Sequence, residues 1–195
     1  MEWLLGLDKH LLYFINGLNF PVLDAVMWQL SKTYTSIPLY LFFIYLFYKN
    51  DGKSFWKPLL AAIVVVVLAD RISVELFKDV VCRLRPSHTE GVAENLHLFI
   101  RSNGSIYKGG LYGFVSSHAA NTFGIATFVA LYARRRGIAI LVFTWAAVVS
   151  LSRVYLGVHY PTDIVAGGML GALVGWLVYL AYRHVILRCA KLNHC

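Results

Sequence analysis

The sequence contains few charged side chains for its length. Only 14% of its 195 residues are Asp, Glu, Lys or Arg, whereas soluble domains contain about 25%. Hydrophobic residues make up 58% of the chain, and its mean hydropathy is +0.62. We therefore expect most of the chain to lie in a lipid bilayer, as a single membrane-embedded domain that covers residues 1–195.

Cysteine is scarce as well. The chain has three cysteines, and none stands in a Cys/His spacing typical of zinc sites; no metal and no cofactor are expected. The net charge of +8 comes without a basic stripe or a recognition helix, so no nucleic-acid partner is expected. The first residues lack a basic region and a small-residue cleavage site, so we expect no cleavable signal peptide.

Long apolar runs account for most of the sequence. Four approach the roughly 20 residues that a membrane-spanning helix needs, and a fifth, shorter run fits a span that begins near Ser31. These runs cover residues 58–81, 114–133, 137–156, 162–182 and 34–48. In residues 1–30, apolar residues recur at helical spacing, which predicts an interfacial amphipathic helix. The expected fold is an all-α polytopic membrane bundle with five spans, or six as the alternative.

Lysine and arginine predict the orientation of these spans. They gather in the connections 49–57 and 134–136 and in a tail that holds Arg183, Arg188 and Lys191. If the spans alternate, all three segments lie at one face, and the positive-inside rule makes that face and the C-terminus cytoplasmic. Residues 82–113 then form an extracytoplasmic loop, which separates Cys82 from Cys189 and Cys195 and excludes a disulfide. A loop of that length is usually functional or mobile.

Three polar clusters stand at helix ends and border the outward connections. They read Lys78-x6-Arg85-Pro86, then Ser116-Ser117-His118, then Ser152-Arg153-x5-His159-x3-Asp163. Each alone has a structural interpretation: basic residues at helix ends snorkel to the headgroups, serine pairs cap helices, and a lone His-x3-Asp forms an interfacial hydrogen bond. Together they supply cations, hydroxyls, two imidazoles and a carboxylate, the set needed for phosphate binding and covalent catalysis at histidine.

The first two clusters suit phosphate binding. Arg85 offers a planar fork for two phosphate oxygens, and Lys78 offers a point charge. Ser116 and Ser117 stand at a helix start, where free N–H groups and the helix dipole favour an anion. His118 in the same turn suits a general acid.

The third cluster suits a nucleophile. His159 and Asp163 lie four residues apart across a helix start, so the carboxylate can accept a proton from one ring nitrogen and leave the other nucleophilic. Arg153 alone would be a commonplace headgroup contact. Asp70 and Glu75 are expected to hold cations in place rather than to act on substrate.

The order and spacing of the clusters resemble the type 2 phosphatidic acid phosphatase (lipid phosphate phosphatase) superfamily, which also includes the vanadium haloperoxidases. The family pattern is Lys-x6-Arg-Pro, then Pro-Ser-Gly-His, then Ser-Arg-x5-His-x3-Asp. The first and third parts match in full, and the resemblance covers residues 78–163. The second part departs at Val115, where the family has Pro, and at Ser117, where it has Gly. Ser117 can still offer its backbone N–H to phosphate if its φ allows.

The resemblance implies a role for each matched residue and metal-independent chemistry. His159 would attack phosphorus and form a phosphohistidine, Asp163 would orient it, and His118 would protonate the leaving group and later activate water. The residues implied to bind phosphate are Lys78, Arg85, Ser116, Ser117 and Arg153. Candidates for headgroup binding, from their place in or beside the loop, are Arg83, His88, His97, Arg101 and Lys108. A solvated loop charge is the alternative for Arg83.

The expected function is hydrolysis of a membrane lipid phosphomonoester or diphosphate, in a bacterial inner membrane with the site facing the periplasm. Undecaprenyl diphosphate and lipid A phosphate are the favoured substrates, because an extracytoplasmic site meets them in envelope assembly. The alternatives are phosphatidylglycerophosphate or phosphatidic acid as substrate, phosphate transfer to another lipid, and a non-catalytic lipid-phosphate binding or transport protein. A haloperoxidase is disfavoured because those relatives are soluble. The sequence leaves the oligomeric state undetermined.

Overall fold

The computed structural model describes residues 2–192, and the elements in this range are helices. The longer ones are α1 (Glu2–Asn16), α2 (Pro21–Leu30), α3 (Ile37–Asp51), α4 (Trp56–Arg71), α6 (Ser117–Ala133), α7 (Arg136–Tyr155) and α8 (Pro161–Leu192). Between α4 and the short α5 (Asp79–Val81), residues Ile72–Lys78 form π-helical turns. Cys195 lies outside the described residues, and so do the side chains of Arg188, Cys189 and Lys191.

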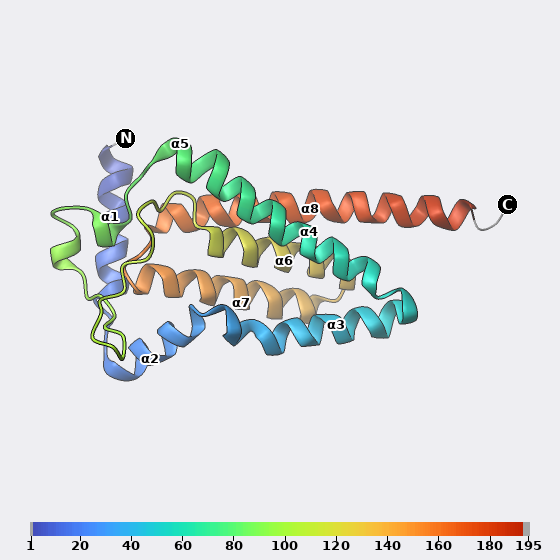
Figure 1. Cartoon of the computed structure of the whole chain (residues 1–195), viewed down its shortest axis with the longest axis horizontal. Helices are drawn as coiled ribbons and strands as arrows, with labels where there is room; N and C mark the ends of the chain where they lie inside the picture. Colours follow the sequence, from blue (N-terminus) through green and yellow to red (C-terminus); the bar gives the residue numbers. More distant parts are fainter. Residues whose placement is uncertain (1, 193–195) are drawn as a thin grey trace.

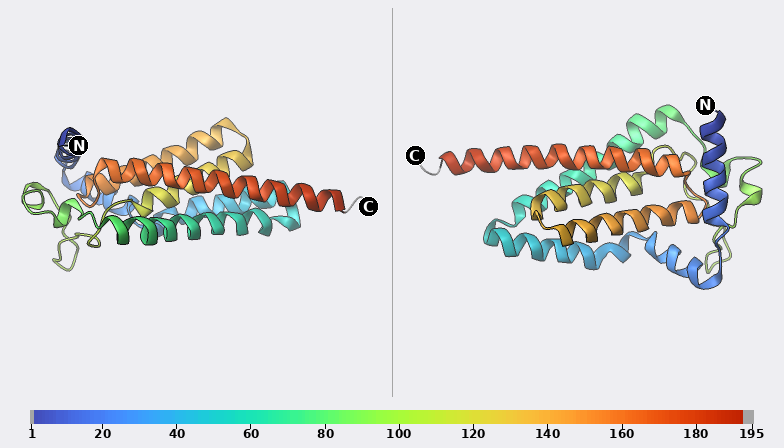
Figure 2. Two further views of the ribbon diagram at one scale, coloured as in Figure 1. Left: turned by 90° about the horizontal axis from the view of Figure 1, so that it is seen from above. Right: turned by 180° about the vertical axis from the view of Figure 1, so that it is seen from behind.

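The helices form an elongated bundle with α1 lying across one end (Figure 1). Helices α3, α4, α6, α7 and α8 run side by side along the long axis, and the irregular segment between α5 and α6 lies at the same end as α1 (Figure 2). The all-α bundle predicted from the sequence is confirmed. The predicted N-terminal segment is two helices rather than one, because the chain bends by 116° between α1 and α2.

Two helices are long and apolar enough to cross a membrane on their own. These are α7 and residues Pro161–Ile186 of α8, and the bent pair of α1 and α2 would be a third if it formed one span. Helix α3 has 15 residues, α6 has 17, and α4 passes into π-helical turns after 16. The count of five spans therefore stays a prediction.

The apolar core lies between α3, α4, α6 and α7. Phe47, Val65, Phe128 and Val142 are among its fully buried side chains. Helix α6 is enclosed by α4, α7 and α8, which holds the N-terminus of α6, and His118 with it, in one place relative to the neighbouring helices.

Helix α8 approaches α6 closely along a stripe of glycines. At Gly167, Gly171 and Gly175, an added Cβ would overlap a backbone carbonyl oxygen of α6 or of its N-cap; for Gly171 this is the carbonyl of Ala120. Small residues four apart let helix backbones approach in this way. The close approach at these glycines sets the distance between the second and third polar clusters. The four-residue spacing of the glycines can be read directly from the sequence.

Candidate active site

The π-helical turns after α4 bring the first cluster to the second. Lys78 closes this segment, and its Nζ donates to Ser117 Oγ at 2.6 Å. Ser73 Oγ lies 2.7 Å from the same hydroxyl. Because π turns widen a helix and shift the side chains that follow, they direct the lysine toward the start of α6.

Arg85 is held inside the loop rather than in solvent. Its side chain is 7% exposed, and its Nε donates to the Tyr112 carbonyl at 3.1 Å. Its NH1 donates to the Val158 carbonyl at 3.2 Å and lies 2.9 Å from His159 Nε2. Gly109 packs against the guanidinium with a φ of +71°, so a side chain there would be both strained and crowded. The loop therefore encloses the side chain of Arg85.

These contacts determine the tautomer of His159. An arginine can only donate, so the Nε2 facing Arg85 is the acceptor and the ring proton resides on Nδ1. Nδ1 lies 3.4 Å from Asp163 Oδ2, and both side chains are buried. Asp163 is itself held by the backbone N–H of Tyr160 at 2.9 Å and by Arg83 at 3.0 Å. The unprotonated nitrogen of His159 therefore faces the cations, and its lone pair accepts from Arg85.

Arg153 completes the cation group. It is 2% exposed, and its NH2 donates to the hydroxyl of Tyr107 at 2.7 Å. Its Nε is buried and has no hydrogen-bond partner among the described residues. A buried donor left in this state costs about 1–3 kcal/mol unless something occupies it, which points to a ligand oxygen at this position.

The N-terminus of α6 brings His118 close to His159. Ser116 is the N-cap: its Oγ accepts from the Ala119 N–H at 3.5 Å, and its own N–H donates to the Asp163 carbonyl at 3.0 Å. The other N–H groups of the first turn have no acceptor within the helix. His118 lies in this turn, close enough to Lys78, Arg85, Arg153 and His159 to interact electrostatically with each of them.

The cluster carries positive charge without a matching carboxylate. Among the described residues, no ion pair includes Lys78, Arg85 or Arg153. Burial and the charge of Arg153 lower the pKa of Arg85 to about 10. Burial and the three cations hold the pKa of His159 well below its ordinary value, which keeps the imidazole neutral. Buried cations cost several kcal/mol each unless paired, so this is a site for an anion.

The loop residues proposed for headgroup binding have varied surroundings. Arg83 is paired with Asp163 and with Asp8 of α1, at 3.0 and 2.6 Å, so it is held within the protein. His97 lies 3.0 Å from Asp24 of α2. The guanidinium carbon of Arg101 lies 5.1 Å from the Tyr107 ring centroid. The backbone carbonyl of Lys108 accepts a hydrogen bond from Ser87. The Nε2 of His88 is buried and has no hydrogen-bond partner in the described range. Headgroup binding by all five stays a prediction.

Sequence reasoning missed residues that support the cluster. Asp8 is 3% exposed and binds Arg83 and Thr162; its position four residues before the buried Leu12 is the pattern that could have revealed it. Tyr107 had no such pattern, because its contact with Arg153 depends on the path of the loop. Within residues 2–192, His, Cys, Asp and Glu do not gather in threes that could hold a metal.

Residues 56–186 match the family model of the PAP2 superfamily, and this range contains all three clusters. The chain belongs to the PAP2 superfamily. The resemblance inferred from the motifs is confirmed. As a PAP2 enzyme, the protein is an integral membrane phosphatase, and its reaction is the hydrolysis of a lipid phosphate or diphosphate.

Individual PAP2 relatives cover nearly the whole chain. It is 37% identical to a lipid A 4'-phosphatase from Bacteroides thetaiotaomicron, over 96% of this chain and 82% of that protein. It is 32% identical to a lipid A 4'-phosphatase from Porphyromonas gingivalis, over 94% and 76%. A PAP2-type phosphatidylglycerolphosphate phosphatase from Bacillus subtilis has a similar fold, with a TM-score of 0.70 at 22% identity over 91% of this chain and 85% of that one.

Proposed function

We propose that this PAP2 enzyme removes a phosphate from a lipid A-type glycolipid at the outer face of a bacterial inner membrane, through a phosphohistidine at His159. The observation that carries the mechanism is the geometry at His159, whose Nε2 lies 2.9 Å from Arg85 NH1 and whose Nδ1 lies 3.4 Å from Asp163 Oδ2. The two relatives named above, both lipid A 4'-phosphatases, support the substrate.

The first half of the reaction transfers the phosphoryl group to the enzyme. Lys78, Arg85 and Arg153 bind the phosphate oxygens with the free N–H groups at the start of α6. His159 Nε2 attacks phosphorus and forms a P–N bond as the P–O bond to the lipid breaks. His118 gives its proton to the departing oxygen. Asp163 stabilises the positive charge that develops on the His159 ring.

The second half returns the enzyme to its starting state. His118, now neutral, takes a proton from a water molecule whose oxygen attacks phosphorus. The P–N bond breaks, inorganic phosphate is released, and His159 is neutral again. The three cations stabilise the additional charge of both transition states, which is the differential binding that catalysis requires.

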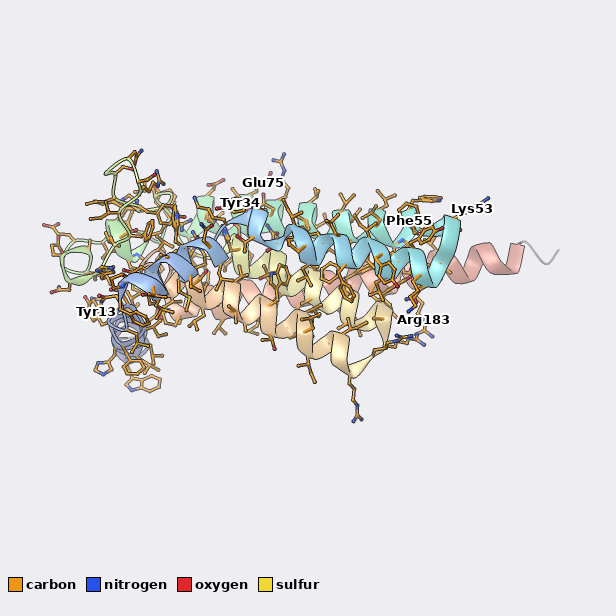
Figure 3. The ribbon with its side chains drawn as sticks, turned by 90° about the horizontal axis from the view of Figure 1, so that it is seen from below. Tyr13, Tyr34, Lys53, Phe55, Glu75 and Arg183 are labelled. Atoms are coloured by element: carbon orange, nitrogen blue, oxygen red, sulfur yellow. The ribbon has the colours of Figure 1, made fainter. Side chains whose placement is uncertain are left out.

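The distribution of basic residues supports the proposed orientation. Lys53 and Arg183 lie at the end of the bundle opposite to Tyr13 of α1 (Figure 3). The loop that holds Arg85 lies at the α1 end (Figure 1). A basic end in the cytoplasm therefore puts the cation cluster on the periplasmic side, where the lipid substrate would be reached from the outer leaflet.

Phosphate release by the purified protein tests this function. In detergent with a chelator present, wild type is expected to release phosphate from lipid A. His159→Ala and His118→Ala are each expected to lower turnover by at least about a thousandfold, as loss of a catalytic nucleophile or acid does. Each variant is incubated with ³²P-labelled substrate and then denatured without acid. A ³²P label that stays on His118→Ala but not on His159→Ala would identify the phosphohistidine.

The control is Lys9→Gln, a change at an exposed position of α1, which is expected to leave turnover unchanged. Near-normal turnover by His159→Ala would show that another group is the nucleophile. No release by wild type from lipid A, undecaprenyl diphosphate or glycerophospholipid phosphates would overturn the hydrolase assignment.

A further inference from the structure

A cavity of about 290 Å³ opens beside the catalytic cluster and is lined at one end by Ser117 and His118. We call it the leaving-group chamber. Its walls come from the segment between α2 and α3, from α4, and from buried and half-buried residues of α6 and α7. Its size is close to the lower limit of roughly 300–1,000 Å³ for small-molecule sites.

The position of His118 indicates which part of the substrate the chamber receives. A general acid must lie within hydrogen-bond reach of the oxygen that departs from phosphorus. The group attached to that oxygen therefore extends to the His118 side of the phosphate, away from His159, which attacks from the opposite side. Because His118 lines the chamber, the chamber receives the leaving group.

The walls next to His118 are polar, although they belong to helices of a membrane bundle. Asp70 of α4 and Asn121 of α6 line the chamber, with hydroxyls of Ser31, Thr33 and Ser36. Asn121 Nδ2 lies 3.5 Å from Asp70 Oδ1, and Asn121 Oδ1 is buried without a partner among the described residues. Asp70 is exposed toward the chamber, whereas the unsatisfied Asn121 Oδ1 is a buried acceptor, and such an acceptor favours a ligand that donates hydrogen bonds.

The chamber becomes apolar with distance from His118. A second cavity of about 280 Å³ shares Thr33, Tyr40 and Val66 with it and continues between α3 and α4 toward Phe47 and Leu59. A substrate that fits this order has a phosphate, then a hydroxyl-bearing group, then a hydrocarbon chain. In a polyprenyl diphosphate, a second phosphate follows the first, and the Asp70 carboxylate disfavours that charge.

We propose that the leaving-group chamber binds the sugar of a phosphorylated saccharide lipid, and that Asp70 and Asn121 are its specificity-determining residues. Hydroxyls of the sugar donate to Asp70 Oδ2 and Asn121 Oδ1, and an acyl chain enters the apolar cavity. Lys32, whose Nζ lies 3.7 Å from the Trp28 ring centroid, also lines the chamber. The inference rests on the proposed hydrolase function and assigns the substrate class of that site.

Two substrates that share a phosphomonoester but differ in the leaving group test the assignment. Lipid A has a sugar next to the phosphate, and phosphatidic acid has a diacylglycerol without free hydroxyls. Asp70→Asn and Asn121→Ala are each expected to lower kcat/KM for lipid A at least about tenfold, the effect of one lost hydrogen bond to a polar site. The kcat/KM for phosphatidic acid is expected to change less than twofold.

The matched control is Glu75→Gln, which also removes a carboxylate charge from the segment that follows Asp70. Glu75 lies on the outer side of the bundle, paired with Arg71 at 2.9 Å and with its side chain 57% exposed (Figure 3). This variant is expected to leave the ratio of the two kcat/KM values unchanged.

Different outcomes would overturn the function and the inference. If wild type hydrolyses neither lipid, the hydrolase function fails. If wild type hydrolyses lipid A but both variants retain its kcat/KM, or lose activity on both lipids equally, the chamber does not select the sugar. A wild-type preference for undecaprenyl diphosphate over lipid A would also overturn the inference, because the chamber would then accept a second phosphate.

Discussion

Ser117 has a hydroxyl where the family pattern has glycine, and that hydroxyl forms hydrogen bonds within the site. It accepts a hydrogen bond from Lys78 Nζ at 2.6 Å and lies 2.7 Å from Ser73 Oγ. The side chain therefore orients a cation of the cluster, and the backbone N–H stays in the first turn of α6. Hydrogen bonds to charged groups contribute about 1.5–3 kcal/mol, so the departure from the pattern brings an additional contact to the site.

Because the pKa of His159 is lowered in the folded protein, the stability of the fold is expected to decrease at acidic pH. Burial and neighbouring cations lower its pKa in the folded protein, whereas the unfolded chain has the ordinary value near 6.5. Below that pH the unfolded state binds more protons, so stability falls as pH falls from about 6.5 toward the folded pKa. The drop in thermal unfolding temperature between pH 7.5 and pH 5.5, measured in detergent, is expected to be smaller in His159→Asn than in wild type. Equal drops would contradict the lowered pKa.

The sequence predicted the residues that have a fixed local spacing and missed those that meet only through the fold. His159 and Asp163 were paired in advance because four residues across a helix start bring side chains together. Asn121 and Asp70 come from different helices, and nothing in either segment indicates the other. Tyr107 reaches Arg153 through an irregular loop whose path has no periodicity to read.

At the scale of elements, α1 is connected to Asp163 by a series of ion pairs. Asp8 of α1 accepts from Arg83 at 2.6 Å, and Arg83 donates to Asp163 at 3.0 Å. Asp8 also accepts from the backbone N–H of Thr162 at 2.9 Å, beside the start of α8. The helix across the end of the bundle is therefore attached to Asp163, the residue that we propose orients His159.

Asp8→Asn is expected to loosen this attachment. Removing one partner of a buried pair costs on the order of 3 kcal/mol, and Asp163 would then be the carboxylate partner that Arg83 retains among the described residues. We expect a lower thermal unfolding temperature and a several-fold lower kcat with little change in KM, because the phosphate-binding cations are untouched. Lys9→Gln, the adjacent exposed change, serves as the reference. An Asp8→Asn enzyme with wild-type kcat would show that α1 does not position Asp163.

The boundaries of the helices could be predicted to within a few residues where apolar runs ended at polar clusters. The break between α1 and α2 was missed, although Asn16-Gly17 is a turn signal and Pro21 suits the first turn of a helix. The π-helical turns of Ile72–Lys78 were also missed, since a wider helical turn has no distinctive residue pattern. These turns direct Lys78 toward Ser117, so the local geometry of the site was less predictable than its composition.

At the scale of the whole molecule, the proposed orientation has a direct test. In a variant without the three native cysteines, Arg101→Cys is expected to react with a membrane-impermeant maleimide in intact spheroplasts. Arg135→Cys, between α6 and α7, is expected to react only after lysis, because the proposed orientation puts the basic end in the cytoplasm. Labelling of Arg135→Cys before lysis would reverse the orientation. Phosphatase activity of each variant checks that the labelled protein is folded.

Lys78, Arg85 and Arg153 form no ion pair within the described part of the chain, and this has a consequence for the enzyme between turnovers. A buried cationic site is most stable when an anion occupies it, and the product, inorganic phosphate, has the same charges and shape as the group that was cleaved. The feature that draws substrate in therefore also retains product. Phosphate release then competes with chemistry as the slow step, and the rate at the membrane surface responds to the phosphate concentration of the surrounding compartment.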